Sequence, residues 1–170
     1  MNDTLNTIWK RRSVRKYEPD PIPAADLHLI LEAARRAPTG GNNQKWCMVV
    51  VTDRELRRRT AAACNHQLWM ADAGAILCLV TLPGGWAVDG TIVLDHAILA
   101  ATSLGYGTCW IGAFDPAQVK QVLGIPADHG IVCLTPVGVP AEQPAARPRK
   151  PPREQFADNR FGVALDYELP

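Results

Sequence analysis

Apolar residues recur along this chain with two spacings, and each spacing predicts a different element. Leu27, Ile30, Leu31 and Ala34 repeat at helical intervals, whereas short Val-rich runs are typical of buried strands. The predicted helices cover residues 4–10, 23–37, 54–64, 88–104 and 116–123. The predicted strands cover residues 46–51, 75–81, 108–111 and 131–137.

Local signals sharpen the ends of these helices. Asp3, Asp53 and Asp115 each stand directly before a helical pattern, where a carboxylate can accept from free N–H groups. Gly124 stands where the helix at 116–123 must stop. The helix at 88–104 has apolar residues nearly all round, so we expect it inside a core or a subunit interface.

The segment from residue 140 onwards is rich in Pro and Arg and cannot build a core of its own. It is either disordered or wrapped around a partner subunit. Its apolar residues favour docking, and the spacing of the middle three resembles a strand. These residues are Phe156, Phe161, Val163, Leu165 and Tyr167.

Composition and charge exclude several classes of protein. The chain has 170 residues, 47% of them hydrophobic, and a net charge of +1, which suits a single packed domain over residues 1–170. A chain this close to neutral is a poor nucleic-acid or membrane-surface binder. No run approaches the roughly 20 apolar residues of a membrane span, and the start lacks the apolar core of a signal peptide. We therefore expect a cytoplasmic protein.

The cysteines and histidines indicate no metal site. The five cysteines are odd in number and contain no CxxC pair. Cys47, Cys78, Cys109 and Cys133 lie in apolar runs, so we expect reduced and mostly buried thiols. The four histidines are not spaced as metal ligands, and neither a P-loop nor a GxGxxG, GxSxG or HExxH motif occurs.

Three clusters could carry chemistry, and each also has a plain structural interpretation. Residues 10–16 combine guanidinium, hydroxyl and ammonium donors, which suit a phosphate monoester but also describe a solvated basic run. Residues 37–46 combine glycines with Asn and Gln, which suit the pyrimidine end of a flavin but also a turn-rich loop. The basic residues at 147–150 form either a solvated run or a weak PxxP ligand.

The order of four motifs changes this picture. RRSVRKY, APTGGNNQKW, GYGTCWIGAFDPAQVKQVLGIP and PVGVPAEQPAARPRKP follow one another over most of the chain. Together they resemble the nitroreductase family of flavoenzymes. The resemblance implies an α+β fold with a mixed central sheet flanked by helices. It also implies a homodimer with FMN at each interface, in which the tail at 140–170 docks on the partner subunit.

The resemblance assigns cofactor-binding roles by position. Arg11, Arg12, Ser13 and Arg15 match residues that hold the phosphate and ribityl chain, and Arg147 with Arg149 match a late pair on the same phosphate. Pro38, Thr39 and Gly40 match a loop given across the dimer to the flavin ring. Asn42 and Gln44 match the N-x-Q signature, and Ile111 with Gly112 match the backbone beside the reactive ring edge. No catalytic side chain and no metal ligand is implied.

The implied activity is transfer of hydride from NADH or NADPH through the flavin to a small-molecule acceptor. A nitroaromatic, a quinone or a similar compound would accept it by a ping-pong mechanism. The short link at residues 82–88 leaves the acceptor open, because covering elements shape the pocket. The alternatives are a flavin-remodelling or dehalogenating enzyme on the same scaffold, and a non-catalytic FMN-binding protein.

Overall fold

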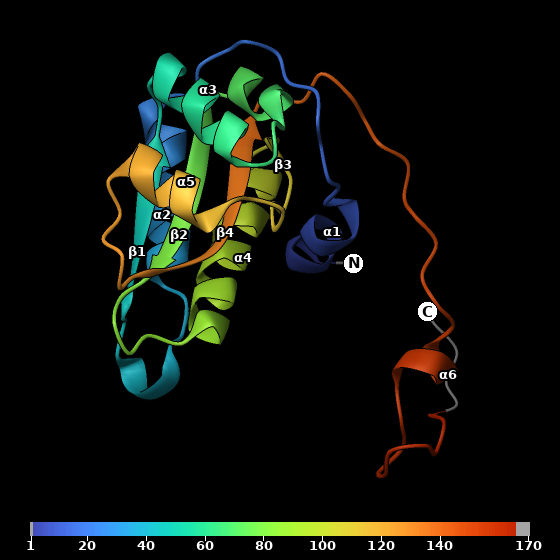
Figure 1. Ribbon diagram of the computed structural model, residues 1–170. Coiled ribbons are helices and arrows are strands. Elements are labelled where there is room, and N and C mark those ends of the chain that lie inside the picture. The colour runs from blue at the N-terminus through green and yellow to red at the C-terminus, as the bar shows by residue number, and fades with distance from the viewer. Residues whose placement is uncertain (1, 166–170) are drawn as a thin grey trace.

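The computed structural model describes residues 2–165 and has one sheet between two helical layers (Figure 1). The four strands lie in the order β1-β2-β4-β3. Their bounds are β1 (Trp46–Val51), β2 (Ala75–Thr81), β3 (Gly107–Thr108) and β4 (Gly130–Gly138). All ladders between them are antiparallel, and the parallel component is a single bridge between Ser13 and Thr108. The expected α+β class is confirmed.

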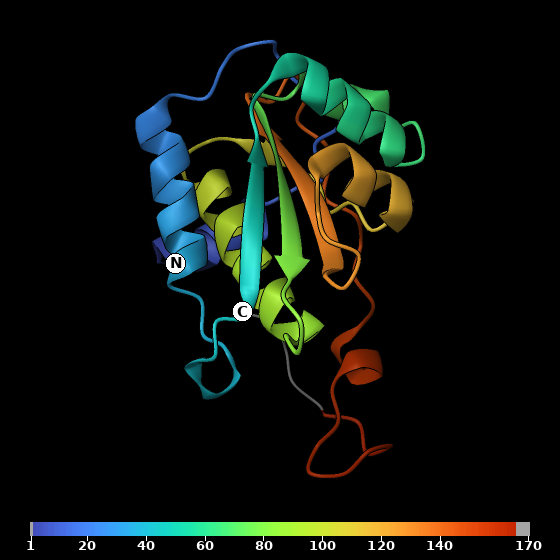
Figure 2. The same ribbon diagram turned by 60° about the vertical axis from the view of Figure 1, so that its left-hand side comes forward.

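Each face of the sheet is covered by its own helices (Figure 2). Helices α2 (Ala24–Arg35) and α4 (Ala87–Ser103) pack on one face, and α3 (Arg54–Ala63), η2 (Leu68–Asp72) and α5 (Pro116–Leu123) on the other. All seven residues of β2 are buried, because side chains alternate across a central strand that has a layer on both sides. Two apolar cores therefore share this strand.

Capping residues mark the starts and ends of the helices largely where the sequence indicates. Asp53 accepts from the Leu56 N–H at 2.7 Å, and Asp115 accepts from two amides at the start of α5. Gly124 adopts a left-handed conformation with φ of 67° after α5. One expected cap is wrong: α1 (Asp3–Lys10) is capped by the Asn2 side chain, which accepts from the Leu5 N–H.

The strand expected at residues 108–111 is interrupted. Its ladder with β4 covers Gly107 and Thr108, and a single bridge joins Ile111 to Leu134. Between them the Cys109 N–H donates to the side-chain hydroxyl of Thr135 at 3.3 Å. A backbone donor spent on a side chain is lost to the ladder, so the regular strand stops.

Four of the five thiols are buried, which is the expected number, but one of the four differs from those expected. Cys64, Cys78, Cys109 and Cys133 are buried and Cys47 is exposed. The prediction that Cys47 is buried was wrong, since it lies early on the edge strand β1, outside the core of α3 and α5. Burial raises the pKa of the Cys64 thiol to about 12 and that of Cys78 to about 12.

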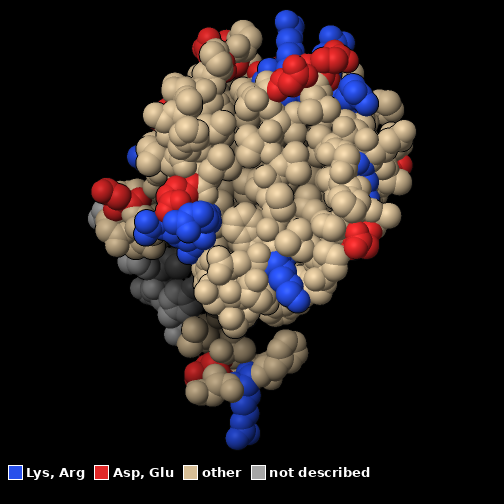
Figure 3. All heavy atoms as spheres, turned by 90° about the vertical axis from the view of Figure 1, so that its left-hand side faces the viewer, with Lys and Arg blue, Asp and Glu red and all other residues tan. Residues whose placement is uncertain are grey.

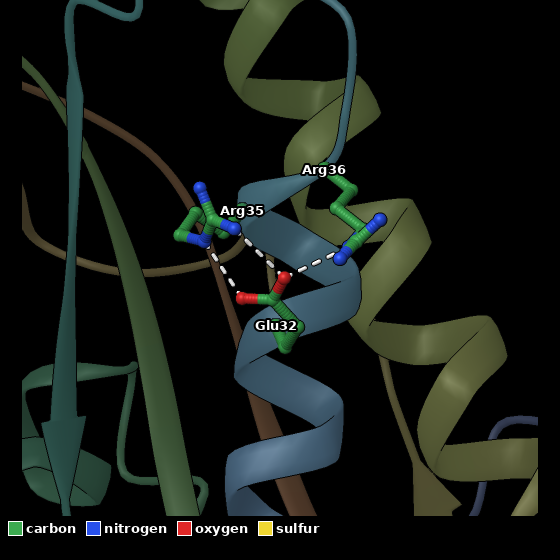
Figure 4. A network of polar contacts seen from close by, with 3 residues as sticks. All are labelled: Glu32, Arg35 and Arg36. Carbon is green, nitrogen blue, oxygen red and sulfur yellow. Dashed lines mark hydrogen bonds and ion pairs between the residues drawn. The ribbon is translucent and has the colours of Figure 1, made fainter.

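Surface charge is distributed unevenly. The face in Figure 3 has few charged side chains across its middle, and most of them lie along its upper edge and in a group at its left. On α2, Glu32 accepts from Arg35 at 2.7 and 2.8 Å and from Arg36 at 2.8 Å (Figure 4). Hydrogen bonds from both guanidinium groups lower the pKa of Glu32 to about 2.

The tail leaves the body of the subunit after residue 142. Pro140 bridges to Tyr17, and the Ala141 N–H donates to the Lys16 carbonyl at 3.0 Å. The chain then extends away to α6 (Pro152–Gln155) (Figure 1). The side chain of Phe161 is fully exposed. The strand-like spacing at 161–165 forms a turn with one bridge, Ala157 to Ala164. Tyr167 lies outside the described residues.

Candidate functional site

The early and the late basic clusters line one cavity. Its volume is about 590 Å³, and its walls come from α1, from the segment after α1 and from the tail. The predicted site residues on these walls are Arg11, Arg12, Ser13, Arg15, Arg147 and Arg149. Segments from the early and the late part of the chain are thereby brought together around an open space, and within residues 2–165 no ion pair joins them.

Hydrogen bonds fix the early cluster against β3 and against the start of the tail. The Val14 N–H donates to the Thr108 carbonyl at 2.9 Å, and the Tyr17 hydroxyl donates to the Val14 carbonyl at 2.7 Å. The Arg15 N–H donates to the Glu142 carboxylate at 2.7 Å, which ties the tail to this segment. At Gly107 an added Cβ would lie 2.9 Å from Val14 Cβ, so glycine is what allows this approach.

The cavity carries positive charge that carboxylates do not neutralise. Among the residues described, none of these five arginines forms an ion pair. Arg12 Nη1 donates to the carbonyls of Trp9 at 2.6 Å and of Arg11 at 2.8 Å. Arg11 Nη1 is buried and has no hydrogen-bond partner within residues 2–165. An unused buried donor of this kind suits a bound anion.

A buried thiol lies beneath the same cluster. Burial raises the pKa of Cys109, while the charge of Arg15 and a hydrogen bond with Ser13 lower it. Cys109 is 3% exposed. We therefore assign it to the packing under the cavity.

The loop that holds the other predicted contacts lies elsewhere in the subunit. Pro38, Thr39, Gly40, Asn42 and Gln44 do not line the cavity, and η1 (Gly40–Asn42) lies at the opposite end of the sheet from α3 (Figure 1). Asn42 and Gln44 have positive φ values of 54° and 50°, which are uncommon for residues with side chains. A single subunit therefore does not bring this loop to the basic cavity.

The two backbone positions after β3 differ in what they can offer. The Ile111 N–H donates to the Leu134 carbonyl at 2.9 Å, and the Ile111 carbonyl accepts from Leu134 at 3.2 Å. Gly112 is exposed, and an added Cβ would meet no atom within 4 Å. Of this predicted pair, Gly112 has the backbone that a ligand can approach.

The sequence interpretation missed two features near these positions. Ile8 and Trp9 line the basic cavity and are half exposed, so α1 turns its apolar face to the cavity rather than to a core. Asp89 on α4 is 6% exposed and accepts from the Gly40 N–H at 3.1 Å. A carboxylate in the first turn of a helix with apolar residues nearly all round was the available signal.

The described residues contain neither a cluster of metal ligands nor a helix that could span a membrane. Within residues 2–165 no group of three or more His, Cys, Asp or Glu side chains is placed to hold a metal ion. Over the same residues no helix combines the length and the apolar character that crossing a bilayer requires.

Comparisons with known proteins agree with one another. The model of the Nitroreductase family matches residues 8–80 and 87–139. An NADH dehydrogenase of Thermus thermophilus is 30% identical, and the match covers 83% of this chain and 88% of that protein. An NADPH-flavin oxidoreductase of Vibrio harveyi is also 30% identical, over 95% of this chain and 75% of that protein.

Solved structures show the same fold. The NADPH:FMN oxidoreductase from Vibrio harveyi, complexed with NAD+, has a TM-score of 0.89 at 27% identity, covering 99% of this chain and 80% of that one. Nitroreductase A from Vibrio parahaemolyticus has a TM-score of 0.90 at 28% identity, covering 99% of this chain and 78% of that one.

Proposed function

This chain belongs to the nitroreductase family, and from that membership we propose that it is an FMN-dependent oxidoreductase that uses NADH or NADPH. The observation that carries the proposal is the cavity in which the early and late arginines meet without carboxylate partners. Relatives named NADPH-flavin oxidoreductase and FMN reductase support the same cofactors.

The residues of the cavity fit FMN. A volume of about 590 Å³ lies in the ordinary range of small-molecule sites. Arg11 and Arg15 would meet the phosphate from one wall and Arg147 and Arg149 from the other, with the Ser13 hydroxyl as a neutral donor. The free Nη1 of Arg11 would gain its missing partner. When bound, the flavin supplies the chemistry of accepting and passing on a hydride.

The protein's own part in the reaction is binding, orientation and electrostatics. Guanidinium groups on the cavity walls would hold the anionic end of the flavin. The exposed backbone of Gly112 is then free to donate toward the ring. We assign no general acid, general base or nucleophile to a side chain.

We propose a homodimer, because one subunit leaves its loop and its apolar faces without cover. The loop at residues 38–44 does not reach the basic cavity of its own subunit, so a partner subunit would supply it. Exposed apolar side chains on α1 and the tail would be covered in the same assembly. They are Leu5, Ile8, Trp9, Phe156, Phe161 and Val163. Sedimentation at micromolar protein tests this, and a stable folded monomer would contradict it.

The link between β2 and α4 supports a broad range of acceptors. Residues 82–86 form a short turn, and the family match is interrupted at residues 81–86. With little chain to cover the ring, bulky planar acceptors should enter, and nucleotide and acceptor should share one face. Ping-pong kinetics follow, with parallel lines in double-reciprocal plots for a small quinone and for a large nitroaromatic. Intersecting lines would contradict the shared face.

A second function has one specific observation in its favour. The 5,6-dimethylbenzimidazole synthase of Rhodospirillum rubrum is 25% identical over 83% of this chain, so one relative is named for synthesis of an aromatic compound. Incubation of the reduced protein with FMN and oxygen, followed by chromatography, separates the two functions. Recovery of intact FMN supports the oxidoreductase, and conversion of the flavin to a smaller aromatic product supports the alternative.

A further inference from the structure

Asp89 is the one charged side chain that is buried among the described residues. It is 6% exposed and lies in the first turn of α4. A buried carboxylate is costly unless hydrogen bonds or opposite charge compensate it. The positive end of a 17-residue helix supplies part of that compensation, and a specific hydrogen bond supplies more.

That hydrogen bond joins α4 to the loop at residues 38–44. Asp89 Oδ1 accepts from the Gly40 N–H at 3.1 Å, and an added Cβ on Gly40 would lie 3.8 and 3.9 Å from the two carboxylate oxygens. The carboxylate therefore lies against the Gly40 backbone. Its Oδ2 is buried and has no partner within residues 2–165.

The position of Asp89 is itself fixed by its neighbour. At Gly90 an added Cβ would lie 2.8 Å from Val132 Cγ2 and 3.0 Å from Leu79 Cδ2. The first turn of α4 is therefore pressed directly onto the sheet, with no room for a side chain between them. A carboxylate on this turn is presented to the loop from a rigid base.

The loop needs such an anchor. Asn42 and Gln44 hold positive φ values, and its other hydrogen bonds are local, such as Gln44 N–H to Thr39 Oγ1 at 3.2 Å. Among the hydrogen bonds described for residues 38–44, the one to Asp89 reaches a distant element. Without it the strained turn has only its own short-range bonds to hold its shape.

We propose that Asp89 is a positioning residue that holds the Gly40 amide, and through it the backbone of the loop at residues 38–44. The effect on flavin binding rests on the proposed function, in which this loop faces the flavin ring in the dimer. Asp89 acts through the loop and touches neither phosphate nor acceptor. Its loss should therefore weaken binding at the ring end and leave the phosphate end unaffected.

The first test needs no flavin. Amide hydrogen exchange at Gly40, followed by NMR on the full chain, should accelerate about tenfold or more in Asp89→Ala, since a partly buried hydrogen bond to a carboxylate is lost. Asp89→Asn keeps an oxygen acceptor of the same size and should stay within about twofold of wild type. Asp95→Ala removes another carboxylate from α4 and serves as the matched control.

The second test uses binding of flavin to the apoprotein. Asp89→Ala should weaken FMN and riboflavin equally, by about tenfold, and shift the visible spectrum of the bound flavin. Asp89→Asn should restore both. A loss confined to FMN would place the effect at the phosphate and would overturn the inference.

Gly40→Pro removes the donor and leaves Asp89 in place. Proline suits the first position of a helical turn, and Thr39 before it is extended, with φ of −133° and ψ of 152°. The Asn42 and Asn43 amides donate to the carbonyls of Thr39 and Gly40, so they report on the shape of the loop. We expect both amides to exchange faster in Gly40→Pro and in Asp89→Ala. The double variant should lose no more amide protection and no more flavin affinity than either single variant.

The outcomes separate the two proposals. Two results would contradict the proposed role of Asp89. One is a loss of flavin affinity in the double variant that equals the sum of the losses in the single variants. The other is a Gly40 amide that is protected equally in wild type and in Asp89→Ala. If Asp89→Ala does not fold, the Gly40→Pro measurement decides in its place. A wild-type protein that takes up no flavin would contradict the proposed function, while the amide measurements would still test the anchor.

Discussion

Replacing Arg11 by Met should weaken FMN binding without weakening the fold. Arg11 Nη1 is buried in the basic cavity and has no hydrogen-bond partner in the described chain. Leaving a buried donor unsatisfied costs the apoprotein about 1–3 kcal/mol, so an apolar side chain of similar length should leave the thermal midpoint unchanged or raise it. If Arg11 instead stabilised the fold through packing or an ion pair, the substitution would lower the thermal midpoint and leave FMN affinity unchanged.

The loss of affinity follows from the bond that Arg11 would make to phosphate. A charge-assisted hydrogen bond is worth about 1.5–3 kcal/mol, which corresponds to about a 10- to 150-fold rise in the Kd for FMN. Riboflavin lacks the phosphate, so its Kd should change by less than about twofold under the same argument.

Fluorescence quenching of each flavin by the apoprotein measures both constants, and calorimetry measures the thermal midpoint. Lys10→Met is the matched control, because Lys10 is the neighbouring cation but does not line this cavity. Equal losses for FMN and riboflavin, or a clear drop in thermal midpoint with FMN affinity retained, would refute the reasoning.

Three further predictions follow from the same structure. Glu32 should titrate near its pKa of about 2, below the ordinary 4.5. Its contribution to stability is therefore complete above pH 4.5 and is lost as the pH falls toward 2. NMR of the carboxyl group checks this, and a titration near pH 4.5 would contradict it. Cys47 alone should react promptly with Ellman's reagent at mild alkaline pH in the folded protein, and Cys47→Ser should abolish that reaction. Gly107→Ala should lower stability by about 1–3 kcal/mol and weaken FMN, because its Cβ would displace Val14; unchanged unfolding and binding would show that the segment can yield.

Much of the fold could be predicted because its signals are local. The continuous apolar runs of β1 and β2 are bounded by turn residues, and both strands have the predicted ends. The short β3 could not be predicted, since its interruption depends on Thr135, a side chain from a strand far along the sequence. Exposure of Cys47 was missed for a related reason: an edge position is a property of the strand order.

The site was accessible to sequence reasoning only through the order of its motifs. Nothing in the spacing of Arg11 and Arg149 indicates that they line one cavity, because the tail must first return along the segment at 16–18. Asp89 was missed because periodicity describes a helix by its apolar face and does not distinguish a buried acidic residue from a partly exposed one such as Asp95. The role of Asp89 depends on its hydrogen bond with Gly40, which belongs to another element.

Anaerobic titration of the FMN-loaded protein with NADH and with NADPH tests the central claim most directly. We expect at least one nucleotide to bleach the visible flavin band completely, and a quinone added afterwards to restore it. Bound flavin that stays oxidised with both nucleotides, or a purified protein that binds no FMN, would contradict the assignment of this chain as a flavin oxidoreductase.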